Sequence, residues 1–455
     1  MYACGPTVYD QPHIGHARSA YIFDVVRRYL VYRGYQVKFV RNVTDVDDKI
    51  IDKARQEFPG EDLISAVKKV STKYLDSYHQ ALQQLNINQD GILEPKASEY
   101  ISKMIKFIEG LIGRGVAYQA GGDVYFDIAK AKNYGKLSHQ SLEKMETGTR
   151  VSPQENKLNP LDFALWKSTK EGEPSWDSPW GKGRPGWHIE CSVMSSDILG
   201  DEFDIHGGGL DLIFPHHENE IAQSEGAGKK FARYWIHHGL LTINGQKMSK
   251  SLGNFITVKD FLDKYKNADF LKLLFLSTHY SHPVDFTEEK IREAKKQKKT
   301  FDNFFEKVNS SRLMKGKQKP ALSEKDKSRI DGFCQEFEKA MDDDFNTPKA
   351  LASLFELTDF ASAREGAFDY GKSKLEGLFN ILGLKVKPKV ELPKEIEEKA
   401  EERDSAREKK DFKKADEKRN EIEKSGYIAI DTGSATSFIL IDSSDDEQDR
   451  QKKII

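Results

Sequence analysis

The sequence is poor in cysteine and has no long apolar run. Its 455 residues include only 3 cysteines, a small and odd number that does not suit a disulfide framework and fits a reducing compartment. No apolar run approaches the roughly 18 residues that a membrane-spanning helix needs, and Met1 opens into sequence of domain character rather than a signal peptide. A formal net charge of −2 neither favours nor excludes nucleic acid as a partner. We therefore expect a cytoplasmic protein with no membrane partner.

The length and the hydrophobic content of the chain are sufficient for several domains. The length exceeds one ordinary domain and predicts about three. Hydrophobic residues make up 38% of the chain and can form cores, whereas the 32% of charged residues indicate much exposed helix.

A short segment near the start combines a cysteine with two histidines. Cys4 is followed by a Gly-Pro turn and by the tetrapeptide His13-Ile-Gly-His16. An amphipathic run at helical spacing comes next, and 37–40 then has the pattern of a strand. This order predicts the first half of a nucleotide-binding βαβ unit, with both histidines near a helix N-terminus that favours phosphate. Taken alone, the spacing fits equally well two loop histidines that cap the helix or fill space.

A second motif, Lys247-Met-Ser-Lys-Ser251, follows about 230 residues later. In isolation it is typical of a basic surface turn. On an α/β pattern, the two segments together resemble the HIGH and KMSKS motifs of class I aminoacyl-tRNA synthetases. Segments 42–49, 186–192 and 206–220 resemble the cysteinyl-tRNA synthetase family, and the resemblance covers nearly the whole chain.

The resemblance implies an α/β fold: a Rossmann-type class I synthetase catalytic domain with an inserted subdomain, followed by α-helical C-terminal domains. Composition also favours an insertion, because Pro, Gly and Trp crowd the middle of the chain. We expect the first half of the catalytic domain at 1–116, a connective insertion at 117–185, the second half at 186–245, the KMSKS loop and stem-contact region at 246–300, a helical bundle at 301–386, an anticodon-binding module at 387–442 and a disordered tail at 443–455.

The C-terminal half is rich in charged helical sequence. Between 287 and 330 there are 14 Lys and Arg against 7 Asp and Glu, which fits either a solvated helix face or a contact surface for phosphates. Further along we expect a helix capped by Asn346 or Thr347, a nearly continuous charged helix up to Lys424, and a hairpin formed by 427–431 and 438–441.

Four residues form a candidate zinc site: Cys4, Cys191, His216 and Glu220. Zinc favours thiolate, imidazole and carboxylate ligands, and residues four apart project from one helix face. Spacing alone leaves His217 open as an alternative to His216, and both cysteines also fit small buried core residues. The resemblance implies one zinc ion on the four matching positions.

A metal would explain how cysteine is told apart from serine. An apolar pocket separates such near-isosteres by only roughly 1–3 kcal/mol. Zinc prefers a soft thiolate to a neutral hydroxyl, so selection at this step makes editing unnecessary. Thr44 and Trp187 are the candidate residues of the amino-acid pocket, although a core tryptophan is an equally good interpretation of Trp187.

The resemblance implies ATP-dependent activation of L-cysteine to cysteinyl-adenylate, followed by transfer to the 3′-terminal ribose of tRNA(Cys). His13 and His16 would contact the phosphates, Gly15 would admit adenine, and Lys247 and Lys250 would close over pyrophosphate. The carboxylate nucleophile is already ionised, so catalysis needs mainly orientation and charge stabilisation. Magnesium is expected with ATP, and we expect a monomer.

Further ATP-binding candidates follow a predicted core strand. Gly207, Gly208, Gly209 and Asp211 could let a ribose or adenine pack on bare backbone, and a plain tight turn is the competing interpretation.

Two other functions remain in competition. A cysteine ligase acting on an amino sugar would share the zinc and both ATP motifs, but the charged helix and hairpin after Pro393 argue against it. A non-catalytic tRNA-binding relative is disfavoured because both histidines, both lysines and all four candidate metal ligands are intact.

Overall fold

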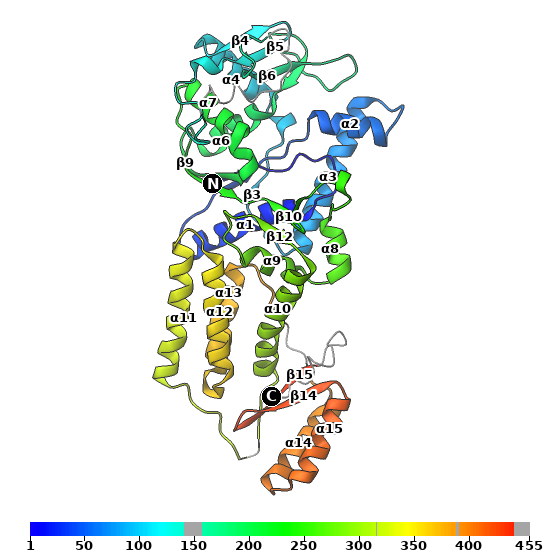
Figure 1. Ribbon diagram of the computed structural model, residues 1–455, viewed down its shortest axis with the longest axis vertical. Coiled ribbons are helices and arrows are strands. Elements are labelled where there is room, and N and C mark those ends of the chain that lie inside the picture. Colours follow the sequence, from blue (N-terminus) through cyan, green and yellow to red (C-terminus); the bar gives the residue numbers. More distant parts are fainter. Residues whose placement is uncertain (141–156, 315, 388–390, 441–455) are drawn as a thin grey trace. The chain divides into compact units, whose positions relative to one another are not determined.

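The computed structural model describes residues 1–140, 157–314, 316–387 and 391–440 (Figure 1). The chain divides into two compact units. The first comprises Met1–Ala268 and Tyr280–Asp285, and the second comprises Asp269–His279 and Phe286–Ile455. The tail predicted at 443–455 lies outside the described residues.

A five-stranded parallel sheet forms the centre of the first unit. Tyr2 pairs with Val40 on one side and with His206 on the other. Because every pairing in this sheet is parallel, the carboxyl ends of its strands meet at one edge, which is where α/β proteins bind ligands. This confirms the α/β prediction. The strand order is β3 (Ile92–Leu93), β2 (Phe39–Arg41), β1 (Tyr2–Ala3), β8 (Phe203–Gly209) and β9 (Ala232–His238).

Amphipathic helices cover this sheet. The run predicted as helical after His16 is α1, whose apolar residues Ile22, Val25, Val26 and Tyr29 are all buried. The α-helices of this unit that matter here are α1 (Ile14–Tyr32), α2 (Asp48–Glu57), α3 (Leu63–Gln84), α4 (Ile101–Gly113), α6 (Trp187–Leu199), α7 (Glu218–Gly226) and α8 (Val258–Tyr265).

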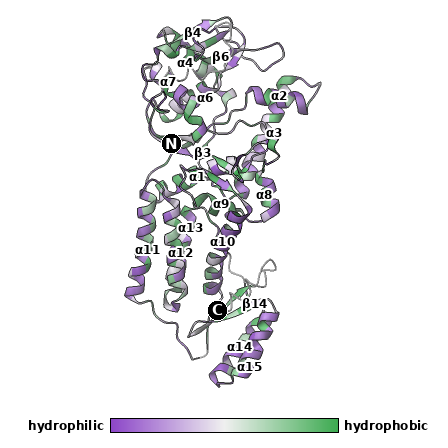
Figure 2. Cartoon of the chain, viewed as in Figure 1, coloured by the Kyte–Doolittle hydropathy of each residue, from purple (hydrophilic) through white to green (hydrophobic). Residues whose placement is uncertain are grey.

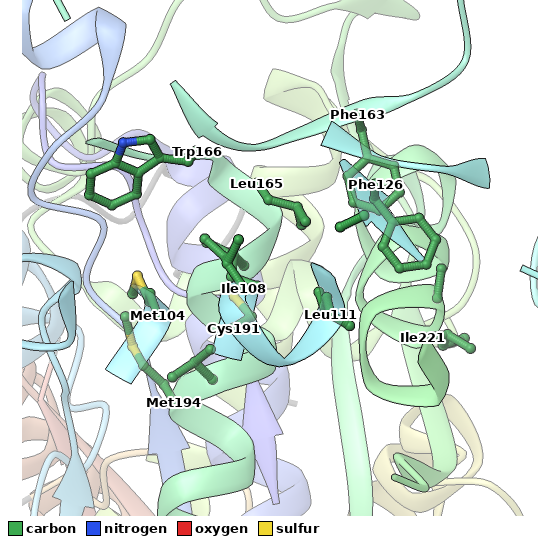
Figure 3. Packing of buried hydrophobic residues seen from close by; sticks show 14 of the residues in the cluster. Met104, Ile108, Leu111, Phe126, Phe163, Leu165, Trp166, Cys191, Met194 and Ile221 are labelled. Atoms are coloured by element: carbon green, nitrogen blue, oxygen red, sulfur yellow. The ribbon is translucent and has the colours of Figure 1, made fainter. Parts of the chain in front are cut away.

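A second, antiparallel sheet occupies the segment in which we expect an insertion. Its strands pack against α4 and α6, and Phe126 stacks on Phe163 with ring centroids 5.1 Å apart (Figure 3). Met104, Ile108 and Leu111 of α4 fill the same core. The strands are β4 (Ala117–Ala120), β5 (Asp123–Phe126), β6 (Phe163–Ser168) and β7 (Gly183–Pro185), in sequence order across the sheet.

A β-hairpin carries the second sequence motif. Strand β10 (Leu241–Ile243) pairs with β11 (Gln246–Lys247), and the two residues between them, Asn244 and Gly245, both have positive φ. An Asn-Gly pair is the preferred turn for a two-residue hairpin. Strand β12 (Val284–Phe286) lies on the other side of β10.

Helices with an aromatic core build the second unit. Phe301 stacks on Phe355 with centroids 4.5 Å apart and meets Phe379 edge-on at 5.0 Å. Its first helices are α9 (Ala268–Leu276), α10 (Glu288–Asn309), α11 (Glu324–Asp342), α12 (Thr347–Ser362) and α13 (Phe368–Ile381). Helix α10 runs through residues 300 and 301, where we expect one domain to end and the next to begin. One lysine of its basic run, Lys298, is 4% exposed and ion-paired with Asp302, so it is not on a solvated face.

The last described segment is a helical hairpin followed by a β-hairpin. The charged helix expected up to Lys424 is two helices, α14 (Lys394–Glu408) and α15 (Phe412–Lys424), interrupted where Lys410 has a φ of +59°. Hydrophilic residues dominate both helices (Figure 2). Strands β14 (Tyr427–Asp431) and β15 (Ala435–Leu440) form the predicted hairpin, and β13 (Arg312–Leu313) joins its other edge.

Within the described ranges, no helix is both long enough and apolar enough to cross a lipid bilayer.

Candidate active site and metal centre

A cleft of about 870 Å³ opens at the carboxyl ends of β1 and β8. Thr44, Gly207 and Gly208 do not line it, and Thr44 is only 1% exposed. The predicted site residues that do line it are Cys4, His13, Gly15, His16, Trp187, Gly209, Asp211, Lys247 and Lys250. The HIGH and KMSKS motifs, which are far apart in the sequence, therefore line the same cleft.

The HIGH turn, His13–His16, starts helix α1. His13 is the N-cap residue, and its Nδ1 accepts hydrogen bonds from the backbone N–H groups of Gly15 (3.1 Å) and His16 (3.3 Å). In return, Nδ1 of His16 accepts from the backbone N–H of His13 at 3.3 Å, which completes a capping box. Because Nδ1 is an acceptor in both rings, the proton of each neutral imidazole sits on Nε2. Each histidine thus keeps one N–H donor for a ligand.

Both of these histidines are neutral at physiological pH. Burial lowers the pKa of His13 to about 4. Burial, with a smaller contribution from His13, lowers the pKa of His16 to about 3. The two rings stack with centroids 3.7 Å apart, which two charged imidazolium rings would not do. They can therefore offer hydrogen bonds to phosphate but not positive charge.

The KMSKS turn, Lys247–Ser251, follows strand β11. Asn254 closes this turn, because its Oδ1 accepts from the backbone N–H of Ser249 (2.8 Å) and its amide donates to the carbonyl of Lys247 (3.1 Å). The ammonium group of Lys250 forms an ion pair with Asp10, three residues before the HIGH turn. The KMSKS turn is therefore in direct contact with the segment that leads into the HIGH turn.

The three glycines Gly207–Gly209, of which only Gly209 lines the cleft, end strand β8 rather than forming a loop after it. Each is crowded by a different neighbour. An added Cβ would lie 2.6 Å from the Phe23 ring at Gly207, 2.8 Å from the Leu212 side chain at Gly208 and 2.2 Å from Oδ1 of Asp211 at Gly209. The missing side chain at Gly209 is what lets the Asp211 carboxylate lie against the strand end.

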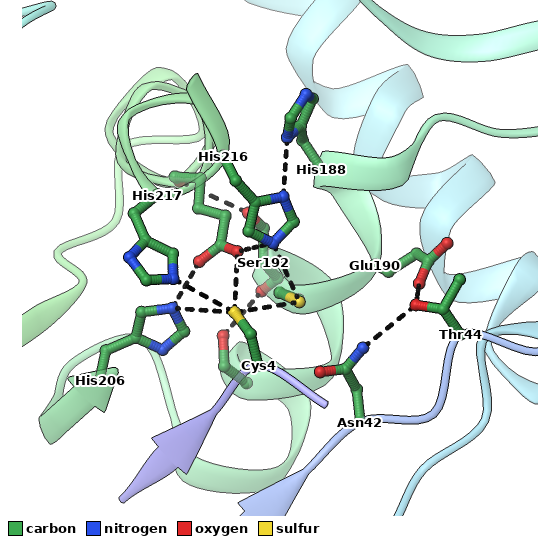
Figure 4. Close-up of polar contacts among 12 residues, drawn as sticks. Cys4, Asn42, Thr44, His188, Glu190, Ser192, His206, His216 and His217 are labelled. Atoms are coloured by element: carbon green, nitrogen blue, oxygen red, sulfur yellow. Dashed lines mark hydrogen bonds and ion pairs between the residues drawn. The ribbon is translucent and has the colours of Figure 1, made fainter. Parts of the chain in front are cut away.

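Four buried or partly buried side chains converge beside the cleft (Figure 4). The two sulfur atoms of Cys4 and Cys191 are 4.0 Å apart, and Sγ of Cys191 is 3.7 Å from Nε2 of His216. Oε1 of Glu220 lies 2.7 Å from that same nitrogen and 3.8 Å from Sγ of Cys4. The four ligand atoms all lie within 4.8 Å of one another. The structure thus brings together the four predicted metal ligands.

A second possible ligand set shares Cys4 and Glu220 with the first. It adds His217, whose Nε2 is 3.2 Å from Sγ of Cys4, and His206, whose Nε2 is 2.7 Å from Oε2 of Glu220. The set that contains Cys191 has two sulfur donors and so suits zinc better.

His216 and His217 each have an orienting partner for the second ring nitrogen. Nδ1 of His216 is 2.9 Å from Nδ1 of His188, and Nδ1 of His217 is 2.8 Å from Nε2 of His237. Spacing in the sequence could not separate these two histidines, and the number of sulfur donors now favours His216.

The protonation of this cluster fits a metal site. Burial opposes a charge on Cys191, but hydrogen bonds with Cys4 and His216 outweigh it and lower its pKa to about 6. Burial raises the pKa of the Cys4 thiol. For His216 burial is outweighed by the Glu220 carboxylate, which raises the pKa to about 10. The protons on Cys4 and His216 are those that a bound cation would replace, and the donor set suits zinc.

The predicted amino-acid pocket residues occupy different positions. Trp187 is 41% exposed and its ring lies 4.2 Å from that of His216, so the interpretation as a core tryptophan is wrong. Thr44 is buried, donates to Oε2 of Glu190 at 2.6 Å and accepts from the Asn42 amide at 3.3 Å (Figure 4). Its hydroxyl is held in one orientation behind the cleft wall.

Sequence reasoning missed several polar residues of this region, among them Asp10, Glu190 and His206. Asp10 and Glu190 stand next to motif residues, so proximity in the sequence was an available signal. His206 sits within a core strand, where a histidine gives no indication of its contacts.

Comparison with known proteins identifies two matching families. Residues 1–296 match the tRNA synthetases class I (C) catalytic domain, and residues 336–387 match the DALR domain. Among curated proteins, a cysteine–tRNA ligase from Thermodesulfovibrio yellowstonii is 45% identical over 465 aligned residues, covering 96% of this chain and 94% of the relative. One from Geobacter sulfurreducens is 44% identical with the same coverage.

Solved structures of class I synthetases share the fold. An arginyl-tRNA synthetase from Campylobacter jejuni, described as putative, aligns with a TM-score of 0.59 at 15% identity and covers 86% of this chain and 94% of its own. A Mycobacterium tuberculosis methionyl-tRNA synthetase in complex with methionyl-adenylate aligns with a TM-score of 0.60 at 14% identity, covering 84% and 88%.

Proposed function

Since the chain belongs to the cysteine–tRNA ligase family of class I synthetases and therefore joins cysteine to tRNA(Cys), we propose that the cleft between the HIGH and KMSKS turns is where ATP activates the amino acid. The observation that carries this proposal is that both motif turns line one cleft, which Cys4 of the Cys4–Cys191–His216–Glu220 cluster also lines. The alternatives of an amino-sugar ligase and of a non-catalytic relative are not favoured, because the match to cysteine–tRNA ligases extends over 96% of the chain.

Activation is a displacement at the α-phosphorus of ATP. An oxygen of the cysteine carboxylate forms a new bond to the α-phosphorus. The bond between the α-phosphorus and the oxygen that bridges to the β-phosphate breaks, and pyrophosphate leaves with that electron pair. The carboxylate is already ionised, so no general base is required. The ribose hydroxyl at the 3′ end of the tRNA then attacks the acyl carbon and displaces AMP.

The HIGH turn stabilises the phosphates by hydrogen bonding. The Nε2–H groups of His13 and His16 are the donors, since both Nδ1 atoms are used in capping α1. Fixed donors cost no reorganisation during the reaction, which is why they stabilise developing charge effectively. Gly15, beside these rings, leaves room for adenine to approach.

The KMSKS turn supplies positive charge to the leaving group. Lys247 and Lys250 contact pyrophosphate, and Lys250 must leave Asp10 to do so. That exposed ion pair contributes little to stability, because solvent screens it, so it is readily exchanged for phosphate contacts. Gly209 and Asp211, which line the cleft, hold the ribose, and Gly207 and Gly208 form the strand end behind them.

Cys4, Cys191, His216 and Glu220 hold zinc in this proposal. When bound, zinc supplies a Lewis-acid site that prefers a soft thiolate to a neutral hydroxyl. Trp187, exposed beside His216, covers the amino-acid side chain, and Thr44 fixes the pocket wall through Glu190. We also propose that the protein acts as a cytoplasmic monomer, which analytical ultracentrifugation and cell fractionation would test.

Charging of purified tRNA tests the overall proposal. We expect cysteine-dependent exchange between ATP and pyrophosphate, followed by attachment of cysteine to tRNA(Cys) and not to other tRNAs. Exchange without charging would contradict the assignment of the tRNA as acceptor.

The metal ligands are tested by removing one thiol. In Cys191→Ala we expect zinc content to fall well below one ion per chain and the preference for cysteine over serine to drop by at least about 10-fold, because the thiolate site is lost. Elemental analysis and exchange kinetics measure the two quantities. Cys334→Ala, in the second unit, is the matched control, and normal zinc with unchanged preference in Cys191→Ala would refute the assignment.

A further inference from the structure

Arg18, one turn after the HIGH motif on α1, is a buried arginine whose partners are backbone carbonyls. Its side chain is 1% exposed. Nη1 donates to the carbonyls of Gly239 (2.5 Å) and Leu240 (2.8 Å), and Nη2 donates to those of Tyr280 (3.1 Å) and His282 (2.6 Å). Four carbonyl groups from two separate segments therefore converge on one guanidinium.

This charge has no acidic partner. Within the described part of the chain, no ion pair joins Arg18 to a carboxylate, and burial alone lowers its pKa, to about 10. Burying a cation without a counter-ion costs free energy, because the charge loses its hydration, and what this arginine stabilises must offset that cost. An apolar residue could fill the space but could not hold four carbonyls in place.

The two segments held by Arg18 form the base of the hairpin that bears the KMSKS turn. Gly239 and Leu240 immediately precede β10, which leads through the Asn-Gly turn to β11 and Lys247. The segments also bond to each other, since the Gly239 N–H donates to Tyr280 (2.8 Å). The tip of the hairpin is tied by Asp285, which accepts from Thr242 (2.7 Å) and from the Gly245 N–H (2.8 Å).

We propose that Arg18 is a positioning residue for adenylate formation, which fixes the hairpin that carries Lys247 and Lys250 at a set distance from the HIGH helix. The inference rests on the proposed roles of these two lysines. His16 and Arg18 both lie in the first turns of α1. The hydrogen bonds of Arg18 therefore hold the base of the hairpin at a fixed distance from the phosphate donors on the same helix. A displacement of about 1 Å at such a group can cost about 100-fold in rate.

A double-mutant cycle between Arg18 and Lys250 tests this. Arg18→Lys replaces the guanidinium with a compact ammonium on a shorter side chain. Its three N–H donors cannot hydrogen-bond four carbonyls at once. We expect it to lower kcat for exchange by about 10- to 100-fold in the otherwise unaltered chain. In the Lys250→Ala background the same change should cost several-fold less, because one of the two lysines that it positions is gone. Zinc content should stay at one ion per chain in all four proteins.

The matched control is Arg28→Lys, the same substitution further along α1, where the arginine pairs with Asp24. It should leave exchange within about 2-fold. Equal losses from Arg18→Lys in both backgrounds would overturn the inference, as would an unchanged rate. An unchanged rate in Lys250→Ala alone would instead contradict the proposed role of Lys250.

A neutral variant protects the test against misfolding. Arg18→Gln removes the buried charge yet keeps two N–H donors, so it should fold if lysine is not tolerated, and it enters the same cycle. If neither variant gives folded protein, Arg18 serves the stability of the unit and the inference is wrong.

Discussion

At the scale of single residues, the HIGH histidines divide their two ring nitrogens between folding and chemistry. Nδ1 of each caps the start of α1, and Nε2 keeps an N–H group that can donate a hydrogen bond to phosphate. The capping hydrogen bonds fix the tautomer, and burial keeps both rings neutral. A residue chosen only for capping, such as serine, would provide the first function without the second.

This arrangement predicts a pH dependence of stability. Because folding lowers the pKa of His13 to about 4 and of His16 to about 3, the unfolded chain binds more protons than the folded chain between those values and its own pKa of about 6.5. The stability that depends on these rings being neutral is fully present above about pH 6.5 and is lost progressively as the pH falls towards their folded pKa values. Denaturant unfolding at pH 7, 6 and 5 should show a shallower decline in His16→Asn than in the unaltered chain.

The exposed residue His139 provides the control. His139→Asn should retain the slope of the unaltered chain, and an identical slope in His16→Asn would contradict the assignment of the lowered pKa.

At the scale of secondary structure, one helix start could be predicted from the sequence and one helix break could not. Asn346, predicted as a cap, is the N-cap of α12 and accepts from the Lys349 N–H at 3.3 Å. The domain boundary predicted at residue 300 falls inside α10, whose helical periodicity is not interrupted there. Lys410 was missed because a lysine with positive φ carries no sequence signal for the break between α14 and α15.

Removing the α12 cap should destabilise the second unit without touching catalysis. We expect Asn346→Ala to lower the free energy of unfolding by about 1 kcal/mol and Asn346→Gly by less, since an uncapped helix start loses one satisfied N–H. Far-UV circular dichroism in denaturant measures both. A reduced exchange rate in Asn346→Ala would show that the effect is not confined to this helix end.

At the scale of the whole molecule, the site divides into a part that sequence can predict and a part that it cannot. The motif residues were predictable because their types and spacing match a chemical task. The contacts between them were not, since Asp10 meets Lys250 across 240 positions and Arg18 meets His282 across 264. Such contacts depend on which strand ends share an edge, and only the folded sheet decides that.

The two units should respond differently to metal removal. All 5 tryptophans lie between residues 166 and 235 in the first unit, so their fluorescence reports that unit alone, whereas circular dichroism reports both. Because the proposed zinc ion would bind only the folded cluster, chelation should lower the fluorescence midpoint by roughly 5 °C. The transition of the second unit should not move. A chelator that leaves the fluorescence midpoint unchanged would argue against a resident zinc ion.

The end of strand β8 limits how this protein can vary. Gly207, Gly208 and Gly209 are each closed by a different neighbour, so no single compensating change elsewhere could admit a larger residue at all three. In a library that randomises this tripeptide under selection for growth, survivors should return to glycine position by position. Substitutions can therefore change the residues that line the rest of the cleft, while the end of β8 keeps its three glycines.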